Sequence, residues 1–158
     1  MVDITKLKKI LFLKSLPDEM VAKLGEIAET RECGEEEILF HQNENLEEFC
    51  MLAAGKVFLN TRAHSGEALT MDEVLPGHSF GVSALMDDNS VSSFTAISAE
   101  PGTILTLSSK KVIDLCRRDS ELGYTLMRRA VKLLKFRQEM HTKQFLYSLA
   151  QHPDIRET

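Results

Sequence analysis

The residue types that most often carry catalysis lie along this chain without a recognisable spacing. The histidines form neither an HxH nor an HxxxH pair, so a metal site would need a cluster made by the fold. The cysteines are odd in number and too far apart for a CxxC pair or a disulfide framework. We expect single surface or turn histidines (His41, His64, His78, His141 and His152) and reduced, packed cysteines (Cys33, Cys50 and Cys116).

Motifs for nucleophilic or phosphate chemistry are missing as well. The sequence contains no Gly-x-Ser-x-Gly, no P-loop and no Cys–His arrangement. Residues 35–37, with Glu44, Glu47 and Glu48, place carboxylates at predicted strand ends and turns, where they are usually solvated. The sequence therefore predicts a protein that is not an enzyme, with no catalytic residues, no metal ligands and no required cofactor.

The elements that would position a binding site change character twice along the chain. Residues 1–30 predict helices, with Pro17 suited to a first helical turn and Asp18 and Glu19 to the positive end of the helix dipole. From Glu32, short β-prone runs separated by turn residues predict a sandwich or barrel-like roll. The runs are Ile38–His41, Phe49–Ala53, Val57–Thr61, Leu69–Leu75, Phe94–Ile97 and Ile104–Leu107, with turns at Cys33-Gly34, Gly55, Ser65-Gly66, Pro76-Gly77 and Pro101-Gly102.

After Leu107 the pattern is helical again, from Ser109 to Cys116 and from about Ser120 to about Leu149. The long helix carries two neighbouring apolar stripes. We expect the first to pack on the roll and the second, with its 4-3-4-3 spacing, to face the same helix of a second copy. One broad face that covers a single domain is the alternative. The first stripe is Met127, Val131, Leu134 and Phe145, and the second is Leu126, Ala130, Leu133, Arg137 and Met140.

Length and charge narrow the class of protein. A chain of 158 residues suits one domain, here residues 1–149 (helices 1–30, roll 31–107, helices 108–149) followed by a tail at 150–158. No leader or membrane-spanning run is present, so we expect a cytoplasmic protein without a membrane contact. Residues 108–149 carry 10 Lys and Arg against 4 Asp and Glu, but the cations recur around the helix. We therefore expect no DNA binding by this chain alone.

Five segments follow one another in a characteristic order. They are the opening segment Phe12–Pro17, a "G-E-x-I" strand in Cys33–Phe40, the hairpin Phe49–Val57, an "L-x-x-G-x-x-F-G" segment Leu75–Gly81 and the helix start at Leu122-Gly123-Tyr124 with Met127-Arg128-Arg129. Their order and spacing resemble the cyclic nucleotide-binding domains of the catabolite-activator (Crp/Fnr-like) family. The resemblance spans about residues 8–147 and implies a mainly β, α+β fold, a double-stranded β-roll or jelly roll with N-terminal helices and a long C-terminal helix.

The family pattern breaks where a cyclic nucleotide would be held. The resemblance implies a glutamate after "F-G" for the ribose and an arginine about ten residues later for the phosphate. Val82 stands at the first position, and Ser92 or Val91 at the second. Two lost charged hydrogen bonds weaken binding by on the order of 3–6 kcal/mol, or two to four decades of affinity. Asp87 and Asp88 in the same loop would also repel an anion.

The resemblance then leaves a set of candidate ligand-binding residues without a defined ligand. Their polar groups suit a neutral or weakly anionic small molecule, or they are cap and strand residues around a pocket filled by Phe80, Leu85, Met86 and Phe94. The set is Phe80, Gly81, Val82, Ser83, Ala84, Ser92 and Ser93, with Thr95 beside it.

The leading interpretation is a non-catalytic sensory module that dimerises through its C-terminal helix and does not bind cyclic AMP or cyclic GMP in the usual way. One alternative is the sensor domain of a cyclic-nucleotide-responsive transcription regulator. The other is a cupin-like metal-binding protein.

Overall fold

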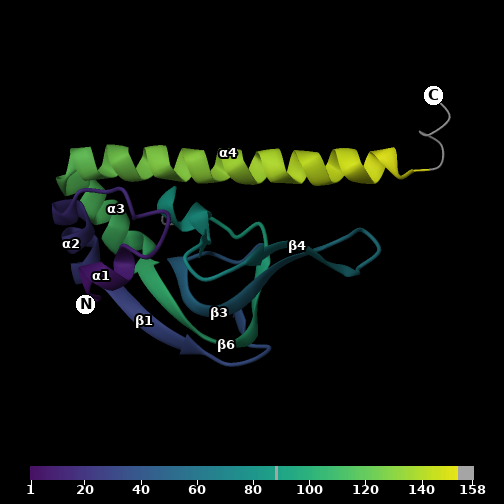
Figure 1. The fold of residues 1–158 in the computed structure, drawn as a ribbon, viewed down its shortest axis with the longest axis horizontal. Coiled ribbons are helices and arrows are strands. Elements are labelled where there is room, and N and C mark those ends of the chain that lie inside the picture. Colours follow the sequence, from purple (N-terminus) through teal and green to yellow (C-terminus); the bar gives the residue numbers. More distant parts are fainter. Residues whose placement is uncertain (88, 153–158) are drawn as a thin grey trace.

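The computed structural model describes residues 1–87 and 89–152, and it begins with the expected helical lead-in. Helix α1 (Ile4–Leu7) is capped by Asp3, whose Oδ1 accepts from Thr5 N at 2.7 Å, and helix α2 (Asp18–Ile27) starts directly after Pro17. Figure 1 shows α1, α2 and the later helix α3 (Ser109–Arg118) gathered at one end of the molecule. The helices therefore close one end of the β-structure.

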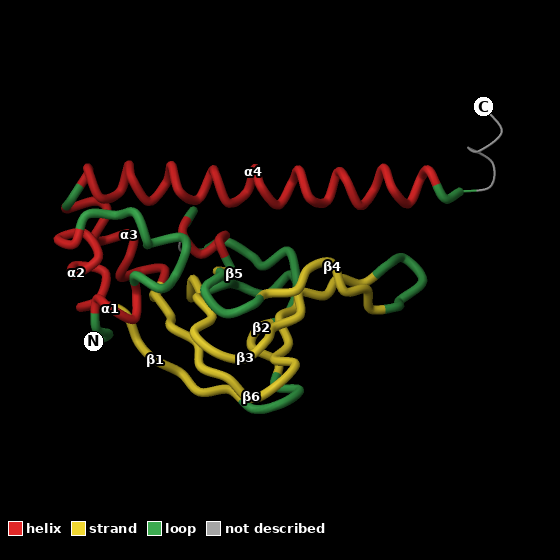
Figure 2. The backbone as a smooth tube through the Cα atoms, in the orientation of Figure 1, coloured by secondary structure: helices red, strands yellow, loops and turns green. Residues whose placement is uncertain are grey.

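The β-structure is one antiparallel sheet that curls on itself (Figure 2). Its main path runs β1-β6-β3-β4, while β2 pairs with β6 and β5 pairs with β3. This is the mainly β roll with helices that the sequence predicts. The strands are β1 (Ala28–Cys33), β2 (Ile38–Phe40), β3 (Glu48–Arg62), β4 (Ala68–Val74), β5 (Ser79–Phe80) and β6 (Thr95–Ser108).

Two predicted turns are bends inside long strands. β3 continues through Gly55 and β6 continues through Pro101-Gly102, and the pairing of β3 with β6 shifts register between Leu52 and Val57. Gly55 has φ +96°, and a Cβ there would lie 2.8 Å from the Cα of Gly102. The glycines allow the two backbones to approach at the bend, so each pair of predicted runs is one strand.

Strand β1 was not expected, and it begins inside the predicted helical lead-in. It pairs with β6 from Ala28 opposite Leu107 to Cys33 opposite Gly102. Only these two end residues are buried, and the four between them are exposed. Because the strand has no alternating apolar pattern, its sequence carries no period-2 signal.

Alternation along β3 and β6 separates two hydrophobic cores. Phe49 and Met51 face the helices, whereas Cys50 and Leu52 face the interior of the roll, as successive strand residues must. The helix-side core also contains residues of the short 3-10 helix η1 (Val82–Leu85) and of helix α4 (Ser120–Ala150). The segment between β5 and β6 and the last helix are thus tied to the same core.

Helix α4 lies along the whole length of the roll (Figure 1). Asp119 caps its first turn by accepting from Leu122 N at 3.1 Å, and Lys23 Nζ of α2 lies 2.8 Å from the same carboxylate. Leu122, Leu126 and Ala130 are buried in the helix-side core. The first half of α4 is therefore packed on its own domain.

The structure corrects the assignment of the two α4 stripes. Leu126 and Ala130, expected at a dimer seam, are 1% and 6% exposed, and Leu133 packs against the same core. Val131, expected to face the roll, is 64% exposed. The domain's own core therefore takes most of the second stripe, because the roll meets α4 on the face centred near Leu126 and Ala130. Met127 packs on the core as expected, while Met140 is 41% exposed.

Candidate ligand-binding site

The segment that leads into the site is a tight turn from β5 into η1. Ser79 and Phe80 pair with Met51 and Cys50 of β3. Gly81 then adopts φ 71° and ψ 34°, and a Cβ there would lie 3.2 Å from Glu48 O and 3.3 Å from a Leu46 methyl. Both the left-handed backbone and the close approach require glycine at this position.

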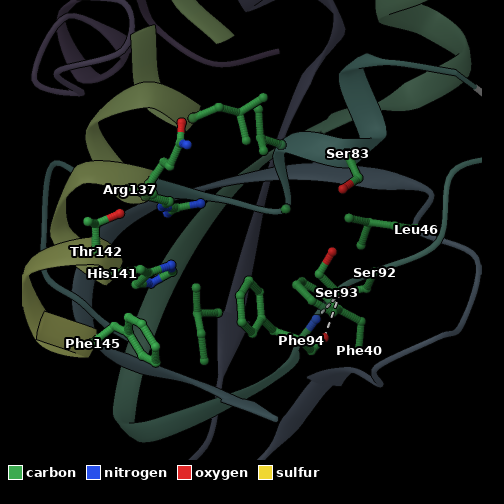
Figure 3. Close-up of a pocket in the computed structure, with 15 residues that line it drawn as sticks. Phe40, Leu46, Ser83, Ser92, Ser93, Phe94, Arg137, His141, Thr142 and Phe145 are labelled. Carbon is green, nitrogen blue, oxygen red and sulfur yellow. Dashed lines mark hydrogen bonds between the residues drawn. The ribbon is translucent and has the colours of Figure 1, made fainter. Parts of the chain in front are cut away.

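A cavity of about 520 Å³ lies between this turn, the segment before β6, the roll and α4 (Figure 3). Its size is within the roughly 300–1,000 Å³ typical of small-molecule sites. The roll side contributes Phe40, Leu46, Leu59, Gly81, Val82, Ser83, Ser92, Ser93 and Phe94, and α4 contributes Leu134, Arg137, Gln138, His141, Thr142 and Phe145.

Five of the seven predicted ligand-binding residues line this cavity, and two do not. Gly81, Val82, Ser83, Ser92 and Ser93 are in its wall. Phe80 and Ala84 are 0% exposed and belong to the two cores. Phe80 stacks on Phe40 with ring centroids 6.0 Å apart. The correction follows from the turn at Gly81, which sends its neighbours at 80 and 84 inward.

The cavity is not filled by the residues expected to fill it. Leu85 lies in the helix-side core, and Met86 is 67% exposed. Phe80 is in the roll core, so Phe94 alone of the expected group reaches the cavity. The space in Figure 3 is therefore open between the labelled side chains.

Ser92 is held in a local hydrogen-bonded turn. Its hydroxyl donates to Phe94 O at 2.6 Å, and Phe94 N donates to Ser92 Oγ at 3.2 Å. Its backbone N–H donates to Glu44 O at 2.9 Å, and its carbonyl accepts from Asn43 N at 2.8 Å. The residue is 4% exposed, so its polar groups serve the turn instead of a ligand.

Asp87 does not face the cavity. Its carboxylate accepts from Asn89 N at 2.8 Å, and its carbonyl accepts from the Ser109 hydroxyl at 3.3 Å. Asp87 is therefore not among the residues that line the cavity, and Asp88 lies outside the described residues.

Arg137 of α4 brings a fixed positive charge to the opposite wall. The side chain is 15% exposed, its Nη2 donates to Ser79 O, and its Nε lies 3.6 Å from Asp72 Oδ2. Burial lowers the pKa of the guanidinium, and the negative charge of Asp72 opposes that shift. An arginine stays protonated under such conditions, so the charge persists. Sequence analysis placed Arg137 at a dimer seam, and the structure places it inside its own domain.

Comparison with known families identifies the fold's lineage. The sequence model of the cyclic nucleotide-binding domain family matches residues 30–119. The chain belongs to this family. The matched range holds the whole roll from within β1, the Gly81 turn, η1 and α3, so it includes the roll wall of the cavity but not α4.

Several solved structures share the fold. A cyclic nucleotide-binding domain from Methylobacillus flagellatus KT superposes with a TM-score of 0.80 at 17% identity, covering 95% of this chain and 84% of that one. The catabolite activator protein of Thermus thermophilus gives 0.70 at 24% identity, covering 87% of this chain and 63% of that one. The sensor domain of the transcriptional regulator DNR from Pseudomonas aeruginosa gives 0.67 at 16% identity, covering 85% and 90%. A search of curated proteins found no significant match.

Within residues 1–87 and 89–152, no three His, Cys, Asp or Glu side chains gather in a way that could hold a metal ion. No helix in these ranges is both long and apolar enough to cross a membrane.

The resemblance implies charged ligand-binding residues in residues 81–93 of the roll wall, the segment called the cassette below. The position where the resemblance implies a ribose-binding glutamate is Val82, which is 6% exposed. The position where it implies a phosphate-binding arginine is Ser92, whose hydroxyl is engaged, or Val91, which is 54% exposed and outside the lining. Among the described residues, the roll wall therefore contributes no charged side chain.

The sequence did not lead us to expect α4 residues in the cavity wall, because the residues of this helix were assigned to two faces by hydrophobic spacing alone. Arg137 and His141 are four residues apart and share a face, between Leu134 and Phe145. A polar pair inside an apolar stripe was the available signal, but Arg137 was assigned to a seam between two copies and His141 was expected to be a surface or turn histidine.

Proposed function

We propose that this chain is a non-catalytic, ligand-sensing module of the cyclic nucleotide-binding domain family that does not hold cyclic AMP or cyclic GMP in the family's usual way. The observation that carries the proposal is the uncharged cassette wall, where Val82 and Ser92 replace the side chains that would bind ribose and phosphate. An open cavity of about 520 Å³ supports a small-molecule ligand.

Isothermal titration with cyclic AMP and cyclic GMP tests this function. The expected result is no saturable heat at micromolar ligand with either compound, because loss of two charged contacts weakens binding by on the order of two to four decades. Micromolar or tighter binding would contradict the proposal and favour the alternative, a sensor domain of a cyclic-nucleotide-responsive regulator.

The module acts as a homodimer through α4, on a different stripe from the predicted one. Tyr124, Val131 and Phe145 are 65%, 64% and 62% exposed, and they recur at multiples of seven residues. Leu134, 43% exposed, lies on the same side, and an apolar repeat of this period suits a second copy of the helix. Leu134 and Phe145 of this stripe also line the cavity, so the partner helix would lie beside it.

Sedimentation of two single variants separates this seam from general surface change. Val131→Glu should give a folded monomer, because the charge would lie against its own copy. Lys132→Glu changes the neighbouring exposed residue and should leave the dimer intact. A parent protein that is monomeric at high micromolar concentration would rule out the dimer.

We expect no sequence-selective DNA binding by this chain. The exposed cations of α4, among them Arg128, Lys132, Lys135 and Lys143, recur around the helix instead of forming one phosphate-tracking face. A gel-shift that shows sequence-selective retention would contradict this expectation.

A further inference from the structure

The polar groups of the cavity are divided unequally between its walls. On the roll side, Ser83 and Ser93 remain after the Ser92 hydroxyl is taken by Phe94. Helix α4 contributes four polar side chains, Arg137, Gln138, His141 and Thr142. The guanidinium of Arg137 and the imidazole of His141 are among them (Figure 3). A ligand's polar end therefore finds most of its partners on α4.

Arg137 is positioned but not saturated. One hydrogen bond, from Nη2 to Ser79 O, fixes the guanidinium plane, and Asp72 lies beside Nε at 3.6 Å. A guanidinium has five N–H donors, so Nη1 and part of Nη2 stay available to a planar carboxylate. Among the described residues no Asp or Glu lines the cavity, and the carboxylate beside Arg137 is that of Asp72, outside the lining.

His141 supplies a second, unpaired group one turn along the same face. Its Nε2 is buried and has no hydrogen-bond partner among the described residues. The ring meets Phe94 edge-on with centroids 6.4 Å apart, which holds the imidazole at the cavity wall. A buried nitrogen without a partner costs free energy, and a ligand oxygen would remove that cost.

The rest of the lining is apolar and partly aromatic. Phe40, Phe94 and Phe145 come from three separate segments, and Leu46, Leu59 and Leu134 fill the space between them. Flat ring faces favour a flat ligand body through offset or edge-to-face contacts. The single fixed cation, already shared with Asp72, suits one negative charge and not two.

We propose that the cavity binds a small aromatic monocarboxylate, with the carboxylate held by Arg137 and His141 and the ring packed between Phe94 and Phe145. This inference rests on the proposed function in that it takes the cavity as the ligand site. The residues proposed to bind the ligand's charged group therefore lie on α4 and not in the cassette.

Two isosteric probes, 2-naphthoate and 2-naphthamide, test the anchor in the wild-type protein without any substitution. They share one ring system and differ in charge at the polar end. By isothermal titration the acid should bind about 10- to 100-fold more tightly than the amide, the range for hydrogen bonds to a charged group. Equal affinities, or no binding of the acid up to about 1 mM, would overturn the proposal.

Matched variants locate the effect. Arg137→Gln should reduce the affinity for the acid to that for the amide, while Lys132→Gln removes one charge from an exposed position of the same helix and should change neither. If Arg137→Gln does not fold, His141→Ala gives a second measurement and should lower the affinity for the acid but not for the amide. Its control is His64→Ala, which changes an exposed histidine and should alter neither affinity. A charge preference that survives both cavity substitutions would overturn the assignment to α4.

The outcome for cyclic nucleotides is separate. Micromolar cyclic AMP binding by the wild type would contradict the proposed function, whatever the naphthoate result. Absence of cyclic AMP binding together with equal binding of acid and amide would leave the proposed function standing and remove only the carboxylate assignment.

Discussion

The two walls of the cavity are built in opposite ways. On the roll wall, the polar atoms of Ser92 are taken up by hydrogen bonds to Phe94, Glu44 and Asn43. On the α4 wall, Arg137 makes one hydrogen bond and His141 Nε2 makes none among the described residues. Ser92 of the roll wall is therefore engaged within the chain, whereas the α4 wall has a nitrogen without a partner among the described residues.

The difference has a consequence for how a ligand would be sensed. The matched family range ends at residue 119, before α4. A ligand anchored on α4 would connect the roll to the helix proposed to form the dimer seam. Binding and assembly would then share residues such as Leu134 and Phe145, which line the cavity and are also 43% and 62% exposed.

The largest expected effect is a difference in the free energy of unfolding between a variant behind the roll wall and a variant on the α4 wall. Phe80→Ala removes a fully buried ring that stacks on Phe40 and should lower the free energy of unfolding by about 3–5 kcal/mol. Thr142→Ala shortens an exposed side chain of the α4 wall and should change the free energy of unfolding by less than about 0.5 kcal/mol. Urea unfolding of both variants measures this. Equal losses would mean that the two walls are not built differently.

Ser92 offers a smaller effect on the same wall. Ser92→Ala leaves Phe94 N without its partner beside a buried turn, so the free energy of unfolding should fall by about 1–3 kcal/mol. The control, Ser93→Ala, changes an exposed neighbour and should stay within about 0.5 kcal/mol of the wild type. If Ser92→Ala leaves the free energy of unfolding unchanged, the Ser92 hydroxyl is not needed for the turn and becomes a candidate ligand contact again.

The smallest effect concerns the electrostatic anchor at the start of α4. Hydrogen bonds from Lys23 and from Leu122 N lower the pKa of Asp119 below its usual value. Since the folded-state pKa is the lower one, the stabilisation is complete above the unfolded value of about 3.9 and is lost as pH falls through the folded value.

Asp119→Asn keeps a capping oxygen and removes the charge. The wild type should be more stable than this variant at pH 7, with the difference disappearing in acid below about pH 4. Denaturant midpoints at a series of pH values measure this. A difference that is independent of pH would show that the Lys23 pairing does not stabilise the helix start.

The roll could be predicted from local residue chemistry, but its longest strands could not. Turn residues at Gly55 and Pro101-Gly102 ended the predicted runs, whereas the structure uses them for facing bends in β3 and β6. A local sequence pattern cannot distinguish a turn from a bend within a strand, because the difference depends on which other strand pairs with the segment. Strand β1 was not predicted either, because its four middle residues are all exposed and give no alternating pattern.

The site was predictable on one wall only. Gly81, Val82 and Ser83 follow a motif that specifies a local turn, so their place in the cavity could be expected. The contribution of Arg137 could not, because it depends on how α4 is rotated against the roll. Val131 and Ala130 are adjacent apolar residues, yet one is 64% exposed and the other 6%, and only the packed structure decides between them.

The central claim is that the ligand's charged end meets α4 and not the cassette. Its most direct test is an NMR titration of the wild-type protein with 2-naphthoate, following the Arg137 Nε–H and the His141 ring together with the backbone amides of residues 81–84. The account predicts saturable shifts that are largest for the Arg137 and His141 side chains. Shifts concentrated in the amides of residues 81–84, with Arg137 and His141 unmoved, would contradict it.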